Sequence, residues 1–238
     1  MCYNGVTIRE MSLLWLHFCK EVKNMKCPKC GSQNSASILY GLPVRDENFN
    51  LHPDLQARID RKEVILGGCC RFINSPVSFC LDCKFKYGSA PYYFYDENAN
   101  CFEETNYRDY RRTIKSFCFT CGGFFQGHKS IQIEKKDGEI TMTVIPPFKR
   151  HFEGITKTIT SDEWYSFLDR IYSDFLLHEW DNRYDNNDDL DGVQWEIKIQ
   201  MENNTMIEYY GSNEYPAYWK EFLSFINGVI IYSGEHFH

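Results

Sequence analysis

The sequence has no apolar run long enough to cross a bilayer. The best run, Leu13 to Cys19, is short and contains His17, whereas a membrane-spanning helix needs about 20 apolar residues. It also makes a poor signal peptide, because charged residues flank it closely and no small-residue cleavage site follows. We therefore expect a cytoplasmic protein without membrane partners, and residues 1–24 as an N-terminal extension.

The sequence also lacks the short motifs of common enzyme classes. The glycine-rich stretch 122–127 has no Lys-Ser/Thr pair for a phosphate loop, and His178-Glu179 is not followed by the second histidine of a zinc-protease helix. No histidine is spaced for a catalytic triad or a metal site. We therefore name no catalytic residue and no organic cofactor.

Positive charge is scarce in the C-terminal part of the chain. Residues 151–238 carry five Lys/Arg against seventeen Asp/Glu, whereas residues 25–90 carry nine against six. An acidic surface repels nucleic acid and anionic membranes. Any contact with nucleic acid is therefore expected in the N-terminal part.

Cysteine, in contrast, is abundant, with 11 residues. The odd number and the chain length argue against a secreted disulfide framework. Cys27 and Cys30 form one Cys-x-x-Cys pair, and Cys80 and Cys83 form another. Each pair closes a tight turn whose sulfurs can face one ion, so two turns supply the thiolates of a tetrahedral Zn²⁺ site. Four thiolates leave no open position for water, so the predicted zinc is structural.

A third pair with this spacing, Cys118 and Cys121, has no matching second pair. Cys69-Cys70 or Cys101 would have to complete a second metal site, but adjacent residues on a strand point to opposite faces. Free cysteine is also common in protein cores. We expect packing, with a second zinc site or a redox switch as alternatives.

The expected fold is α+β. Residues 25–90 are expected to form a zinc ribbon-like, β-rich unit, because strands at Ser35–Leu42 and Val64–Leu66 flank a helix that starts near Pro53. Residues 91–238 are expected to form an antiparallel sheet with two or more packed helices. Its expected elements are hairpins at 130–144 and 193–210, helices from Thr160 and from about Pro216, a helical or irregular segment at 107–113, and a frayed tail with His236 and His238.

The blocks CPKCGS, ILYGLP, VILGGCC and SPVSFCLDC resemble the zinc-ribbon segments at the start of many bacterial proteins of unknown function. The later blocks DGVQWEIKI and YYGSNEYPAYWKEFLSFI are similar to a bacterial α+β domain. The resemblance covers about half of the chain and implies a fold and a metal, but no reaction. One residue departs from the pattern, since Lys84 follows Cys83 where glycine is usual. The second turn therefore requires a residue other than glycine in a strained or adjusted conformation.

These features predict a non-enzymatic, zinc-stabilised protein that binds a protein partner. The first alternative is nucleic-acid binding through the N-terminal unit. Four lysines near the cysteine pairs support it: Lys26, Lys29, Lys84 and Lys86. The second alternative is a thiol-dependent enzyme that uses Cys118 or Cys121.

Overall fold

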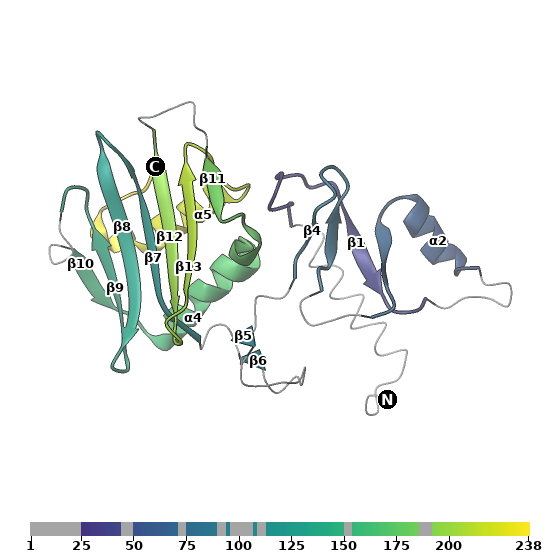
Figure 1. Cartoon of the computed structure of the whole chain (residues 1–238), viewed down its shortest axis with the longest axis horizontal. Coiled ribbons are helices and arrows are strands. Elements are labelled where there is room, and N and C mark those ends of the chain that lie inside the picture. Colours follow the sequence, from purple (N-terminus) through teal and green to yellow (C-terminus); the bar gives the residue numbers. More distant parts are fainter. Residues whose placement is uncertain are drawn as a thin grey trace. The chain divides into compact units, whose positions relative to one another are not determined.

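The computed structural model describes residues 25–43, 50–70, 75–89, 94–95, 107–108, 113–149, 154–185 and 192–238. The chain divides into two compact units between Ala90 and Pro91 (Figure 1). The fold is mixed α+β, with a four-stranded sheet in the first unit and a seven-stranded sheet in the second. Within the described ranges, no helix is both long and apolar enough to span a membrane. The expected N-terminal extension, residues 1–24, lies outside these ranges.

The first unit is a sheet with the strand order β2-β1-β3-β4. β1 (Ser35–Tyr40) and β2 (Val64–Gly68) are parallel, and helix α2 (Pro53–Asp60) connects them. A parallel pair requires such a crossover connection. β3 (Ser78–Cys80) pairs antiparallel with β1 on its other side and with β4 (Lys86–Tyr87). The two strands and the helix predicted between the cysteine pairs are confirmed.

The core of the first unit is small. Its buried apolar side chains include Ala36, Ile38, Val64 and Tyr87. The Tyr87 hydroxyl donates a hydrogen bond to the carbonyl of Met25 at 3.0 Å, which holds the start of the unit against β4. A core of this size supplies little stability by itself. A metal crosslink would therefore contribute a large share of the folding free energy.

The second unit is built on a sheet with the order β10-β9-β8-β7-β12-β13-β11. All neighbours are antiparallel except β13 and β11, which are parallel. The strands are β7 (Ile114–Gly123), β8 (Gly127–Lys136), β9 (Glu139–Ile145), β10 (Ile155–Thr158), β11 (Arg183–Asp185), β12 (Gln194–Met201) and β13 (Met206–Ser212). Both predicted hairpins, β8–β9 and β12–β13, are confirmed.

Two helices cover one face of this sheet. They are α4 (Ser161–Asp169), which continues into a single π-helical segment η4 (Arg170–Asp174), and α5 (Trp219–Val229). The Phe117 ring packs on Phe167 of α4 with centroids 5.0 Å apart, and the Phe119 ring packs on Phe222 of α5 at 5.1 Å. Both phenylalanines lie on β7, two residues apart, so the helices share the same face.

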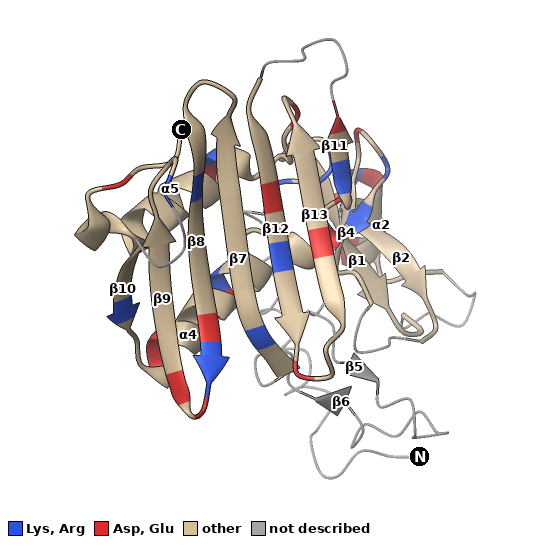
Figure 2. Ribbon diagram, turned by 60° about the vertical axis from the view of Figure 1, so that its left-hand side comes forward, with Lys and Arg blue, Asp and Glu red and all other residues tan. Residues whose placement is uncertain are grey.

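The other face of the sheet is polar, and Figure 2 marks the charged residues along the strands. There Thr120 and Ser130 of neighbouring strands approach to 2.9 Å, and Lys198 lies 2.8 Å from Glu196. The two faces follow the period-2 alternation of an antiparallel sheet with one solvated side. The predicted helix start at Thr160 is also confirmed, because Thr160 and Glu163 form a capping box: the Glu163 backbone N–H donates to the Thr160 hydroxyl, and the Glu163 carboxylate accepts from the Thr160 N–H.

Two sequence predictions were wrong. The segment 107–113, expected to be helical or irregular, instead begins with β6 (Tyr107–Arg108), a short strand paired with β5 (Phe94–Tyr95), while residues 109–112 lie outside the described ranges. The segment with His236 and His238 is not frayed, because Phe237 between them is buried and its ring lies 4.9 Å from that of Phe119. Both errors concern short segments whose structure depends on partners distant in sequence.

Candidate metal centre

The structure brings the four predicted cysteine ligands together. The Sγ atoms of Cys27, Cys30, Cys80 and Cys83 all lie within 4.8 Å of one another. Cys27 Sγ is 3.5 Å from Cys83 Sγ, and Cys30 Sγ is 3.6 Å from Cys80 Sγ. A tetrahedral ion with Zn–S bonds of about 2.3 Å places its sulfurs about 3.8 Å apart. The cluster therefore fits one ion with little adjustment.

The two Cys-x-x-Cys turns have the same backbone structure. The Gly31 N–H donates to the Cys27 carbonyl at 2.8 Å, and the Lys84 N–H donates to the Cys80 carbonyl at 3.0 Å. A second bond in each turn runs from Cys27 N–H to the Ser32 carbonyl (2.8 Å) and from Cys80 N–H to the Phe85 carbonyl (2.9 Å). The repetition shows that each turn presents its two sulfurs in the same way.

The residue that follows each pair has a left-handed backbone. The φ angle is 72° at Gly31 and 65° at Lys84. Glycine adopts this conformation without strain, but a residue with a Cβ atom does not. The strain expected at Lys84 from the sequence is thus present.

Replacing Lys84 with glycine should relieve that strain. We expect the Lys84→Gly variant to raise the free energy of unfolding of the first unit by about 1 kcal/mol. The matched change Gly31→Ala should lower it by a similar amount. Chemical denaturation of the metal-loaded protein measures both, and a destabilised Lys84→Gly variant would contradict the strain at this position.

A hydrogen-bonded clasp joins the two turns. The Asp82 carboxylate accepts from the Ser32 hydroxyl and, at 2.7 Å, from the Asn34 side-chain amide. These two donors hold the pKa of Asp82 below its usual value. The Leu81 N–H also donates to the Asn34 carbonyl at 2.9 Å. The clasp fixes the separation of the two turns, and it could not be predicted because nothing in the cysteine spacing points to these residues.

The inner sulfurs are withdrawn from solvent. Cys27 and Cys80 are both 0% exposed. Burial raises the pKa of the Cys27 thiol to about 12, although backbone N–H groups in its own turn oppose the shift. The pKa of Cys80 falls to about 7, because burial, which raises it, is outweighed by the backbone N–H groups of Cys83 and Asp82 and by neighbouring thiols. The backbone donors in both turns are placed to stabilise thiolates, the form that binds metals.

Neither a scan against protein-family models nor a search of curated proteins finds a match for this chain. The assignment of the site therefore rests on its own geometry and ligand chemistry. Within the described residues, these four cysteines are the only group of three or more His, Cys, Asp or Glu side chains placed to hold a metal ion. Thiolate sets of this kind favour soft or borderline ions, such as zinc, copper(I) and the iron of iron–sulfur clusters.

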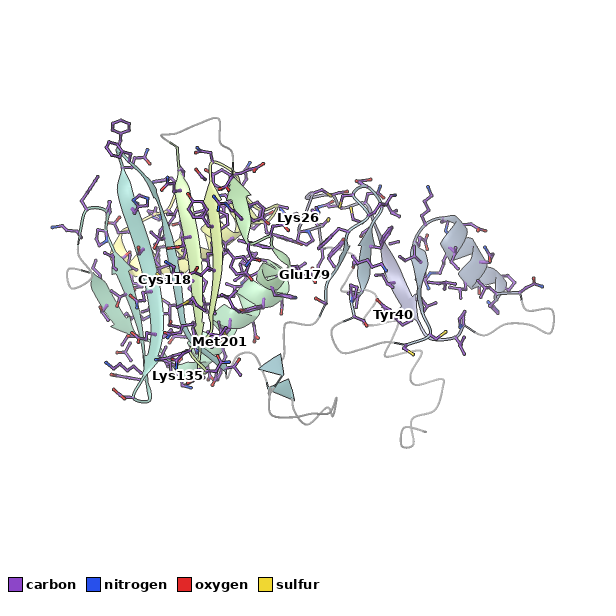
Figure 3. All side chains as sticks on the ribbon, in the orientation of Figure 1. Lys26, Tyr40, Cys118, Lys135, Glu179 and Met201 are labelled. Carbon is purple, nitrogen blue, oxygen red and sulfur yellow. The ribbon has the colours of Figure 1, made fainter. Side chains whose placement is uncertain are left out.

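Cys118 and Cys121 are not placed to share one metal ion. Cys118 and Cys121 lie three residues apart on β7, so their side chains point to opposite faces of the sheet (Cys118 is labelled in Figure 3). Cys69 and Cys70 belong to the first unit, where both are exposed. Cys101, the remaining candidate ligand, lies outside the described residues.

The thiols on β7 are expected to be unreactive. Burial raises the pKa of Cys118, and it raises that of Cys121 to about 12 from an ordinary value of 9.0. A shift of this size reduces the thiolate fraction of Cys121 by about 1,000-fold at neutral pH. In a mass-spectrometric time course with iodoacetamide, we expect the exposed Cys69 and Cys70 to be labelled well before Cys118 and Cys121. Rapid labelling of Cys118 or Cys121 would instead support the thiol-dependent enzyme.

Proposed function

We propose that the first unit is a zinc ribbon that holds one structural Zn²⁺ through Cys27, Cys30, Cys80 and Cys83. In this proposal the chain is a non-enzymatic binding protein of a bacterial cytoplasm. The observation that carries the proposal is the closed set of four sulfurs within 4.8 Å. The resemblance of the surrounding sequence blocks to bacterial zinc ribbons agrees with it.

Zinc is the ion that best fits this ligand set. Four cysteines in paired turns are a common structural zinc site, and Zn²⁺ accepts tetrahedral sulfur coordination without a redox change. Because four protein ligands fill the coordination shell, the ion has no position at which to activate water. In this proposal the zinc ion stabilises the small first unit and takes no part in a reaction. The proposed activity of the protein is then binding.

Metal analysis of the purified protein tests the proposal. We expect native mass spectrometry to show one zinc ion per chain, and none after the protein is denatured in acid. The Cys83→Ser variant should lose the ion, whereas Cys70→Ser, which changes an exposed cysteine outside the cluster, should retain it. A full complement of iron, or no metal in freshly purified protein, would contradict a zinc ribbon.

Nucleic-acid binding is the second candidate, and the lysines near the turns favour it. Lys29, Lys84 and Lys86 are exposed, and Lys29 Nζ lies 5.7 Å from the centre of the Phe85 ring. Cations beside an aromatic ring can pair with phosphates and stack a base. If this candidate is correct, reversing all three charges should weaken single-stranded DNA binding and flatten its salt dependence by about 0.7 per lost contact. No binding at low salt would eliminate it.

A further inference from the structure

The segment after Gly234 lies in a groove of the second unit. Gly234 has a φ of 72°, which turns the chain out of the short helix η6 (Ile231–Ser233). The groove contains a hollow of about 500 Å³. Its walls come from the β7–β8 hairpin, the stretch after β9, the start of β12 and the segment itself, and include Cys121, Gly127, Lys129, Pro147 and Val193. Residues far apart in sequence thus surround Glu235–His238.

The Asn227 side chain on α5 forms two hydrogen bonds with the backbone of this segment. The Phe237 N–H donates to Asn227 Oδ1 at 2.6 Å, and Asn227 Nδ2 donates to the Phe237 carbonyl at 2.9 Å. A single amide therefore satisfies both backbone groups of one residue, as a neighbouring strand would. Such contacts select a peptide backbone and not a particular side chain.

The Phe237 side chain fills an apolar site. It is 4% exposed, and its ring lies 4.9 Å from that of Phe119 in the core of the unit. Burial of a large aromatic ring contributes strongly to binding because it removes apolar surface from water. This contact favours an aromatic side chain on the residue whose backbone is hydrogen-bonded to Asn227.

The positive charge of Lys129 favours an acidic residue two positions before the aromatic one. Lys129 Nζ lies 3.5 Å from the Glu235 carboxylate, and both side chains are largely buried. The same ammonium group donates to the His236 carbonyl. The groove therefore combines a cation for an acidic residue, an amide for the backbone and an apolar site for an aromatic ring.

An exposed aromatic side chain adjoins the hollow. Phe148, which follows the lining residue Pro147, is 76% exposed. The Phe148 ring lies directly over Gly127, where an added Cβ would be 2.9 Å from it. Apolar side chains exposed around a hollow are typical of surfaces that bind partners. The hollow beside this segment leaves room for a ligand longer than Glu235–His238.

We propose that this groove binds an extended peptide of a partner protein that carries an acidic residue two positions before an aromatic one. In the free chain, Glu235–His238 occupies the site in cis. The inference deepens the proposed function, because it supplies a partner class for the binding protein. An attached segment competes at an effective concentration in the millimolar range, so a partner peptide must displace it.

Binding of a labelled peptide in trans tests the proposal. The probe is fluorescein-labelled SGEHFH, and fluorescence anisotropy measures its affinity for the full chain and for a chain that lacks residues 235–238. We expect the shortened chain to bind at least about 10-fold more tightly. A peptide with alanine at the phenylalanine position should not bind. The Phe237→Ala variant of the full chain weakens the hold of the attached segment without removing it. This variant should also bind the probe more tightly than the unaltered protein.

A charge reversal separates recognition from simple packing. The Lys129→Glu variant should not bind the probe, but it should bind a peptide with lysine at the glutamate position. The substitution leaves the apolar site for the aromatic ring unchanged. Circular dichroism confirms that each variant is folded, and zinc content reports on the first unit, so failure of the metal site and failure of the groove are distinguishable. If no folded variant binds its matching peptide at 1 mM, the groove is ordinary packing and the proposal is wrong. A concentration-dependent dimer of the full chain would assign the groove to a second copy and also overturn it.

Discussion

Replacing Cys27 or Cys80 with serine is expected to unfold the first unit. Both side chains are fully buried, and each supplies one of the four proposed zinc ligands. Binding of structural zinc contributes about 10–16 kcal/mol in small zinc-binding peptides, and this binding free energy is folding free energy. The small core of the first unit cannot offset a loss of that size. Limited proteolysis followed by mass spectrometry should show rapid cleavage within residues 25–90.

The second unit provides an internal reference for this experiment. Its sheet and helices have their own aromatic core, so the fragment that begins near residue 91 should resist the protease in the same digest. The matched control is Cys70→Ser, which makes the same chemical change at an exposed position of the first unit. This variant should resemble the unaltered protein. Simultaneous loss of both units would contradict two independently folded domains.

The four candidate ligands could be predicted because their signal is local. In the two matched pairs the turn sets the direction of both sulfurs. Cys118 and Cys121 have the same spacing but lie on a strand, so it is the presence of a matching second pair that distinguishes the site. The clasp between Asp82, Ser32 and Asn34 could not be predicted in this way. It depends on the pairing of β3 with β1, and common polar residues carry no sign of that pairing.

The same distinction explains which parts of the fold were predictable. The β8–β9 hairpin turns at Asp137 and Gly138, both with positive φ, and this dipeptide is a strong local signal. The central strand β7 was not predicted, because Cys118 places an apolar side chain on the polar side of its alternation. Only its pairing with both β8 and β12 makes it a strand. β11 has three residues, too few to show a period.

A methyl group at Gly211 is expected to destabilise the second unit strongly. Gly211 lies on β13 directly opposite Trp195 of β12, and an added Cβ would be 2.1 Å from Trp195 Nε1. The indole cannot move away easily. It is 1% exposed, its Nε1–H donates to the Glu214 carbonyl at 2.9 Å, and its ring packs on Trp219 at 4.7 Å. Overpacking at such a site typically costs 1–3 kcal/mol, so we expect Gly211→Ala to lower the free energy of unfolding by about 3 kcal/mol.

Urea denaturation followed by tryptophan fluorescence measures this loss, and Gly228→Ala is the matched control. Gly228 lies in the last turn of α5, and an added Cβ there meets nothing within 4 Å. Alanine is the better helix former, so this variant should gain up to about 1 kcal/mol in the same transition. If the free energy of unfolding falls for Gly211→Ala and rises for Gly228→Ala, contact with Trp195, and not the loss of glycine as such, causes the destabilisation. A stable Gly211→Ala protein would mean that the indole occupies a different position.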